Sequence, residues 1–234
     1  MKTTDPLLLR CLALTGSFET GKLPPGCFSS LAGDFDGQGL SFSCLQWNIG
    51  QKTLQPLLSQ MYAEHSVVMQ SCFGENSLHL QPILALQLPQ QLGWARSIQG
   101  PSNHVIDPDW AAGFAALGAT PEWQAIAQTS AEGFFDHARY QAVQFRLKSD
   151  RAMALLFDIA VQNGGVPNLA AKHVQANIPA GPDEQEVMQL IAQAIADVCT
   201  PRFRQDVLSR KMTIANGIGV VHGLRYDLAA EFAL

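Results

Sequence analysis

The chain has 234 residues, of which 47% are hydrophobic and 15% charged, and a formal charge of −5. This length is enough to bury a substantial core in one large domain or in two lobes, and the low charge argues against a disordered or coiled-coil chain. Lys and Arg are not clustered, which makes nucleic acid an unfavourable partner. No apolar run reaches the roughly 20 residues that span a bilayer, so we expect no membrane insertion.

The first expected element is a helix over residues 5–18, because apolar side chains recur there at helical spacing. Gly and Pro residues over 21–26 then break the chain. Residues 33–39 are too rich in glycine for a helix. Alternation of apolar and polar residues over 40–47 predicts a short strand or hairpin.

Everything after about residue 53 reads as helical. Pro121 and Glu122 form a helix start signal, and Asn163-Gly164-Gly165 is typical of a helix end. The strongest helical patterns lie at 54–61, 110–117, 123–147, 152–161, 184–198 and 203–215.

These elements predict a mainly α fold of the α+β type. We expect a single domain over 1–234, with two helical lobes, a small β element after the first helix and a cleft between the lobes. The best candidate for a crossing between lobes is residues 99–109.

The cysteines and histidines show no pattern of metal binding. No CxxC, HxxxH or HExxH spacing occurs, so we expect no metal and no cofactor. Buried free thiols are the simplest expectation, and a disulfide among the first three cysteines stays open if the working compartment is oxidising. The five cysteines are Cys11, Cys27, Cys44, Cys72 and Cys199.

Two carboxyl groups, Glu19 and Asp36, have the settings that cleavage of a glycosidic bond requires. That reaction needs one protonated and one ionised carboxyl group on opposite sides of the sugar. Glu19 follows Phe18 at the end of an apolar helix, and apolar surroundings favour a protonated carboxyl group. Asp36 lies among Asp34 and glycines, where water and backbone donors favour the ionised form. The alternative is that Glu19 ends a helix and both aspartates are turn residues.

The order of these motifs resembles the catalytic region of the glycoside hydrolase family 46 chitosanases, which belong to the lysozyme-like superfamily. The resemblance rests on Phe18-Glu19 followed by the turn 33–41, GDFDGQGLS. Weaker similarities extend over 144–150, 154–164 and 209–211. The resemblance implies a lysozyme-like fold and hydrolysis of an amino-sugar polymer.

The resemblance also implies roles for individual residues. Glu19 is similar in position to the general acid, and Asp36 to the base that activates water. Ser41 takes the place of a threonine that helps to hold that water. Asp158 and Arg210 match a buried charge network that orients the acid, and their alternative is an ordinary ion pair between helices.

The chain departs from the chitosanases at positions that affect the substrate. Leu40 replaces an aromatic residue of the turn, and Thr53 falls where those enzymes carry an acid that contacts the amino group of glucosamine. The loss of that acid favours an N-acetylated polymer over a cationic one. Amides and an indole nearby suit N-acetyl groups and a pyranose ring. The residues expected to bind substrate are Asp34, Gln46, Trp47 and Asn48, and packing in the core is the alternative for Trp47.

Segments 16–19 and 45–57 resemble lysozymes that are delivered by phages or secretion systems. We therefore expect cleavage of β-1,4 bonds in the glycan strands of peptidoglycan, with inversion and with carboxyl groups roughly 6.5–9.5 Å apart. The negative charge is unfavourable for steering to an anionic wall. The alternatives are a chitosanase acting on deacetylated chitin and a non-catalytic glycan-binding module.

The apolar stretch 6–14 lacks a strong basic lead and a small-residue cleavage site, so we expect no signal peptide. A wall substrate then implies delivery by a secretion system or by lysis, and the alternative is that the chain is a piece of a longer protein. We expect a monomer, and a cognate immunity or inhibitor protein as a partner of an antibacterial effector. The run 214–223 is similar to a loop of such lysozymes, and the sequence assigns it no role.

Overall fold

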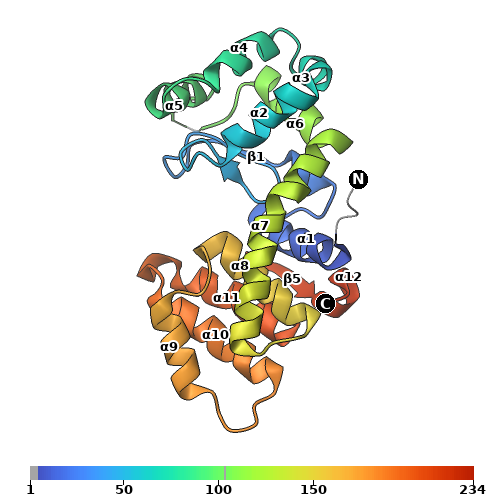
Figure 1. Ribbon diagram of the computed structural model, residues 1–234. Coiled ribbons are helices and arrows are strands. Elements are labelled where there is room, and N and C mark those ends of the chain that lie inside the picture. The colour runs from blue at the N-terminus through green and yellow to red at the C-terminus, as the bar shows by residue number, and fades with distance from the viewer. Residues whose placement is uncertain (1–4, 103) are drawn as a thin grey trace. The chain divides into compact units, whose positions relative to one another are not determined.

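The computed structural model describes residues 5–102 and 104–234. These residues form twelve α-helices, a three-stranded antiparallel sheet and a two-stranded hairpin. The mainly α fold with a small β element after the first helix, as the sequence predicted, is confirmed. Figure 1 shows the order of the elements along the chain.

The chain divides into two compact units. The first contains Met1–Gly21 and Ala131–Leu234, and the second contains Lys22–Ser130. One division therefore falls inside the helix α7 (Pro121–Phe145). The segment 99–109, predicted as a crossing, belongs to the second unit, where Gln99 pairs with Ile106 in an isolated antiparallel bridge. Residue 103 of that segment lies outside the described residues.

The first unit is built around one buried helix, α8 (Asp150–Asn163). Every residue from Ala152 to Ala160 is buried, which is the pattern of a helix surrounded by others. The helices α1 (Pro6–Thr20) and α11 (Arg204–Asn216) pack on α8, and α10 (Glu184–Val198) packs on α11 and α8. These helices lie side by side in Figure 1. The remaining elements of this unit are α9 (Asn168–Asn177), the 3-10 turn η2 (Pro201–Phe203), β4 (Ile218–Val221), β5 (Leu224–Asp227) and α12 (Leu228–Phe232).

The second unit carries the small sheet. Its strands pair in the order β1-β2-β3, with Ser41 opposite both Ala32 and Asn48. Phe42 on the central strand packs against Phe114 and Trp123, with ring centroids 4.9 Å away in each case. The elements are η1 (Gly26–Ser29), β1 (Leu31–Ala32), β2 (Ser41–Phe42), β3 (Trp47–Asn48), α2 (Leu54–Glu64), α3 (Ser66–Phe73), α4 (Asn76–Ile83), α5 (Leu88–Ser97) and α6 (Pro108–Gly118).

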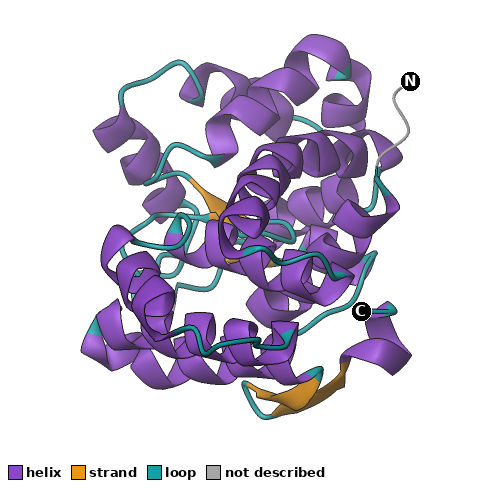
Figure 2. Cartoon of the chain, turned by 60° about the horizontal axis from the view of Figure 1, so that its bottom comes forward, coloured by secondary structure: helices purple, strands orange, loops and turns teal. Residues whose placement is uncertain are grey.

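The expectation that the chain is helical after residue 53 is wrong for 218–227, which form the antiparallel hairpin β4–β5. Gly217 adopts a left-handed φ of 77° and ends α11. The turn residues His222 and Gly223 have φ values of 51° and 81°, the backbone that a two-residue hairpin turn requires. Figure 2 shows this hairpin in orange near the C-terminus. β-branched residues at 218, 220 and 221 favour a strand over a continued helix.

All five cysteines are free thiols. Cys11, Cys27 and Cys44 are buried, while Cys72 and Cys199 are half-buried. Burial raises the pKa of the Cys11 thiol, which keeps that sulfur protonated. No group of three or more His, Cys, Asp and Glu side chains within residues 5–102 and 104–234 is arranged to hold a metal ion. In the same residues, no helix is both long and apolar enough to cross a membrane.

Close packing of α6 on η1 depends on a glycine at the end of α6. A Cβ atom at Gly118 would overlap the carbonyl oxygen of Phe28 and lie 2.5 Å from the Cα of Ser29, both of them backbone atoms. We therefore expect Gly118→Ala to lower the free energy of unfolding by about 1–3 kcal/mol. Urea denaturation measures this change.

Gly93 is the matched control, because it lies inside α5 and a Cβ atom there meets no atom within 4 Å. Gly93→Ala should raise the free energy of unfolding by about 0.5–1 kcal/mol, since glycine weakens a helix interior. Equal stability of the two variants would show that the contact of α6 with η1 does not need glycine.

Candidate active site

Glu19 lies in the last turn of α1, where the helix ends. The N–H of Gly21, which has a left-handed φ of 68°, donates to the carbonyl of Ser17 at 2.8 Å and closes the turn. Phe18 is buried and meets the ring of Tyr226 edge-on, with centroids 4.8 Å apart. The side chain of Glu19 is 23% exposed. The sequence thus places a partly open carboxyl group directly after a buried aromatic residue.

A buried arginine joins Glu19 to a second carboxylate. The Nη2 atom of Arg210 lies 2.7 Å from Oε1 of Glu19 and 2.7 Å from Oδ1 of Asp158. The Nε atom of Arg210 also donates to both oxygens of Asp158, at 2.9 and 3.0 Å. The structure therefore brings together Glu19 of α1 and the two residues, Asp158 of α8 and Arg210 of α11, that the resemblance placed behind it.

Lys211 completes this cluster and had no role in the sequence analysis. It is fully buried, and its Nζ lies 2.6 Å from Oδ2 of Asp158 and 2.5 Å from Oε1 of Gln162. Thr15 donates its hydroxyl to Oδ1 of Asp158 at 3.1 Å. The sequence signals for Lys211 were its position directly after Arg210 and its place in the segment 209–211 that resembles the chitosanases. Consecutive helical residues do not usually share a partner, so these signals gave Lys211 no role. The cations Arg210 and Lys211 thus balance the carboxylates of Glu19 and Asp158.

The electrostatics of the cluster depend on this balance. Burial alone would raise the pKa of Asp158, but Arg210 and Lys211 outweigh burial and lower that pKa to about 2. Burial likewise lowers the pKa of Lys211 to about 8, although Asp158 favours the charged form. For Arg210, burial alone would lower the pKa. The nearby carboxylates of Asp158 and Glu19 outweigh burial and raise that pKa above its ordinary value. At neutral pH, Asp158 and Arg210 are therefore both charged.

Asp36 belongs to the second unit and lies at the exposed tip of the turn 33–39. Its Oδ1 accepts the N–H of Gln38 at 3.1 Å. The turn is fixed by the side chain of Gln99, which follows α5 in the chain. Gln99 accepts the N–H of Asp34 at 2.8 Å and donates to the carbonyl of Gly39 at 2.6 Å. These contacts leave the carboxylate of Asp36 open to water.

Asp34 holds the turn, although the sequence predicted that it binds substrate. Its side chain is only 8% exposed, and Oδ2 lies 2.6 Å from Nε of Arg96. Its Oδ1 accepts the N–H of Gly39 at 2.6 Å. Against the effect of burial, Arg96 and the Gly39 N–H lower the pKa of Asp34. Both carboxylate oxygens are therefore occupied within the protein.

The other residues predicted to bind substrate are also engaged within the fold. Trp47 is 4% exposed, so it packs in the core and presents no open face for a pyranose ring. The Nε2 of Gln46 donates to the carbonyl of Ser43 at 2.8 Å. Asn48 is buried, and its Oδ1 accepts the N–H of Gln51 at 2.8 Å. Ser41 is half-buried on the central strand β2.

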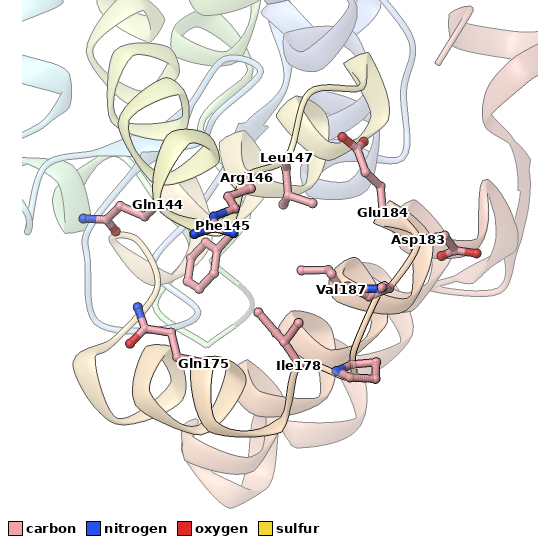
Figure 3. A pocket seen from close by; sticks show the side chains of 12 residues that line it. Gln144, Phe145, Arg146, Leu147, Gln175, Ile178, Asp183, Glu184 and Val187 are labelled. Carbon is pink, nitrogen blue, oxygen red and sulfur yellow. The ribbon is translucent and has the colours of Figure 1, made fainter.

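The first unit also contains a cavity of about 670 Å³ that sequence reasoning did not anticipate. Figure 3 shows it between the end of α7, the end of α9 and the start of α10. Phe145, Ile178 and Val187 give it an apolar wall, and Gln144 and Gln175 bring amides to it. It is lined by other residues than those predicted to act in catalysis.

Asp158 is the residue whose loss should unbalance the buried cluster. Asp158→Asn leaves Arg210 and Lys211 buried with Glu19 as the one remaining anion, and we expect the free energy of unfolding to fall by about 3–5 kcal/mol at neutral pH. The control is Asp197→Asn, which breaks an exposed pair with Arg204 and should cost less than about 1 kcal/mol.

Acid should reduce the difference in the free energy of unfolding between wild type and Asp158→Asn. The pKa of Asp158 falls from an ordinary value of 3.8 to about 2 on folding, so its stabilising effect is complete above pH 3.8 and is lost towards pH 2. That loss is worth roughly 2 kcal/mol. Denaturation at several pH values checks this, and a constant difference would contradict it.

Comparison with known proteins identifies the fold. Neither a protein-family model nor a curated protein sequence matches the chain. Among solved structures, a chitosanase complex aligns with 18% identity and a TM-score of 0.62 over 93% of this chain and 94% of the other. Chitosanase OU01 with substrate gives 17% identity and 0.64 over 93% and 94%. Native chitosanase from Bacillus subtilis MY002 gives 16% and 0.58 over 91% and 88%. The chain therefore has the lysozyme-like fold of the chitosanases.

Proposed function

We propose that the chain is a glycoside hydrolase that cleaves β-1,4 bonds in the glycan strands of peptidoglycan. The observation that carries this proposal is the pair Glu19–Arg210. A partly exposed carboxyl group at a helix end is held by a buried arginine whose charge is shared with Asp158. This arrangement suits a general acid, which must keep a fixed orientation and exchange a proton with a substrate.

In this mechanism Glu19 donates a proton to the glycosidic oxygen. Arg210 holds Oε1 at 2.7 Å, so Oε2 is the oxygen that carries the proton. When the proton leaves, Arg210 stabilises the carboxylate that forms, without any movement of the side chain. Asp158 keeps the guanidinium in place, and Lys211 in turn holds Asp158.

Asp36 is the base that removes a proton from the attacking water. Its exposure and the fixed turn around it support this role, because a base must be ionised and must reach water. Ser41 follows the same turn and helps to hold the water. Direct attack by water gives inversion at the anomeric carbon.

Thr53 supports an N-acetylated substrate over a cationic one. Its Oγ1 accepts the N–H of Asn48 at 2.8 Å, and it brings no negative charge to a position where the resemblance to chitosanases implies an acid. Peptidoglycan as the substrate implies action at a bacterial wall after delivery by a secretion system or lysis. An immunity protein that blocks the site would then protect the producing cell.

Chitosan is the second candidate substrate. The solved structures that share the fold are chitosanases, one of them crystallised with substrate. The formal charge of −5 also favours a cationic polymer.

Replacing the acid should stop turnover. Glu19→Gln keeps an oxygen that accepts from Arg210 but carries no transferable proton, so we expect hydrolysis to fall by about 10²-fold or more with glycan binding retained. The measurements are clearing of peptidoglycan sacculi and release of reducing sugar from chitosan. Glu132→Gln, at an exposed position of α7, is the matched control and should keep full activity.

The substrates separate the candidates. Clearing of sacculi by wild type but not by Glu19→Gln would support the peptidoglycan proposal. Activity on chitosan alone would reject peptidoglycan as the substrate and support chitosan instead. Binding of either polymer without hydrolysis would identify a glycan-binding module and reject the enzyme.

The stereochemistry of the product tests the role of Asp36. We expect proton NMR of freshly released sugar to show the inverted anomer, and Asp36→Asn to lower turnover by about 10²- to 10⁴-fold. A retained configuration would reject Asp36 as a base, because retention requires a carboxylate that attacks the sugar itself.

A further inference from the structure

The turn of the β4–β5 hairpin places a histidine against the end of α1. Nδ1 of His222 lies 3.2 Å from the carbonyl oxygen of Phe18, the residue before Glu19. Nε2 lies 2.5 Å from Oδ1 of Asp206 on α11. The hairpin also contacts this end of α1 through Tyr226, whose hydroxyl donates to the carbonyl of Ser17 at 3.4 Å.

Each ring nitrogen of His222 lies against an oxygen that accepts hydrogen bonds. A carbonyl oxygen and an ionised carboxylate have no hydrogen to give, so each needs an N–H from the ring. A neutral imidazole carries one N–H and can satisfy only one of them. The doubly protonated imidazolium satisfies both at once, which makes it the form that fits this geometry.

The position of the contact makes it relevant to Glu19. The last carbonyls of a helix lack partners within the helix, and the carbonyl of Phe18 belongs to this group in α1. A cation at the C-terminal end of a helix also interacts favourably with the helix dipole. The His222 imidazolium therefore fixes the backbone of the turn from which the Glu19 side chain extends.

Asp206 connects the same histidine to the buried cluster. Its Oδ2 accepts from Nε2 of Gln162 at 3.2 Å, and Oε1 of Gln162 lies 2.5 Å from Nζ of Lys211. Lys211 contacts Asp158, which is bound to Arg210 and thereby to Glu19. A continuous series of hydrogen bonds thus runs from exposed His222 to the carboxyl group of the proposed acid.

We propose that His222 in its imidazolium form is a positioning residue for Glu19, holding the end of α1 through Phe18 and joining it to α11 through Asp206. The proposal rests on the proposed function of Glu19. The charged group in contact with the ring is Asp206 of α11, Glu19 is the adjacent group on α1, and Arg225 is an exposed cation of the same hairpin.

His222→Asn tests the role directly. Asparagine accepts the left-handed backbone of the turn, but it cannot reach both acceptors and does not titrate. We expect kcat to fall by about 10-fold with KM unchanged, since small displacements of a catalytic group cost up to about 10²-fold.

Asp206→Asn distinguishes the effect of the charge on His222 from the effect of its hydrogen bonds. Its amide can donate to Nε2 of a neutral imidazole while Nδ1–H still donates to Phe18, so the contacts no longer need the cation. We expect kcat within about 3-fold of wild type, a small change for a retained hydrogen bond. His79→Asn, at an exposed position of α4, is the matched control and should behave as wild type.

Two measurements test the proposal without turnover. Long-range nitrogen NMR of the imidazoles should show both ring nitrogens of His222 protonated in wild type, with the signal assigned by its absence in His222→Asn. Amide exchange of Gly21, whose N–H closes the end of α1, should be faster in His222→Asn and unchanged in His79→Asn. A singly protonated ring, or unchanged exchange, would overturn the proposal. If both measurements give the expected result but the protein hydrolyses no glycan, only the proposed glycosidase function is refuted. The role of His222 at the end of α1 would stand.

Discussion

The contact of Arg210 with two carboxylates is the interaction on which the rest of the first unit depends. One buried guanidinium reaches Asp158 in the centre of the unit and Glu19 at its edge. A guanidinium is suited to this position because it is planar, stays charged and offers several donors in a fixed geometry. The helices α1, α8 and α11 each contribute one residue, so their packing and the orientation of Glu19 are set by the same contacts.

This cluster is costly as well as stabilising. Buried charges lose their hydration, and an ion pair in a protein interior often gives no more stability than apolar side chains of similar volume. Here nearly all of the polar atoms have hydrogen-bond partners within the cluster. Thr15 and Lys211 contact Asp158, and Gln162 is a second partner of Lys211. The depressed pKa of Lys211 shows the remaining cost. A cluster built only for stability would not need Glu19 at its exposed end.

Most helices could be predicted from the sequence because their patterns are local. The helix α10 begins and ends where its apolar spacing and its Asp183–Glu186 capping box indicate. The hairpin β4–β5 was missed although β-branched residues at 218, 220 and 221 favour a strand. Its strands have only four residues each, and the backbone angles of the turn at His222 and Gly223 leave no periodic pattern in the sequence. The group of Glu19, Asp158 and Arg210 came from resemblance, and Lys211 was overlooked although it is adjacent in sequence. The burial of Trp47 and Asp34 could not be predicted, because sequence does not distinguish a polar or aromatic residue that faces water from one that is buried.

The balanced charges around Asp158 also affect how the protein responds to heat. The hydration of charged groups becomes less favourable as temperature rises, so the penalty for burying them declines. Hydrophobic contacts such as those along Ala152–Ala160 gain no comparable advantage. The cluster of Glu19, Arg210, Asp158 and Lys211 therefore holds the end of α1 relatively more strongly in a warm environment than in a cold one.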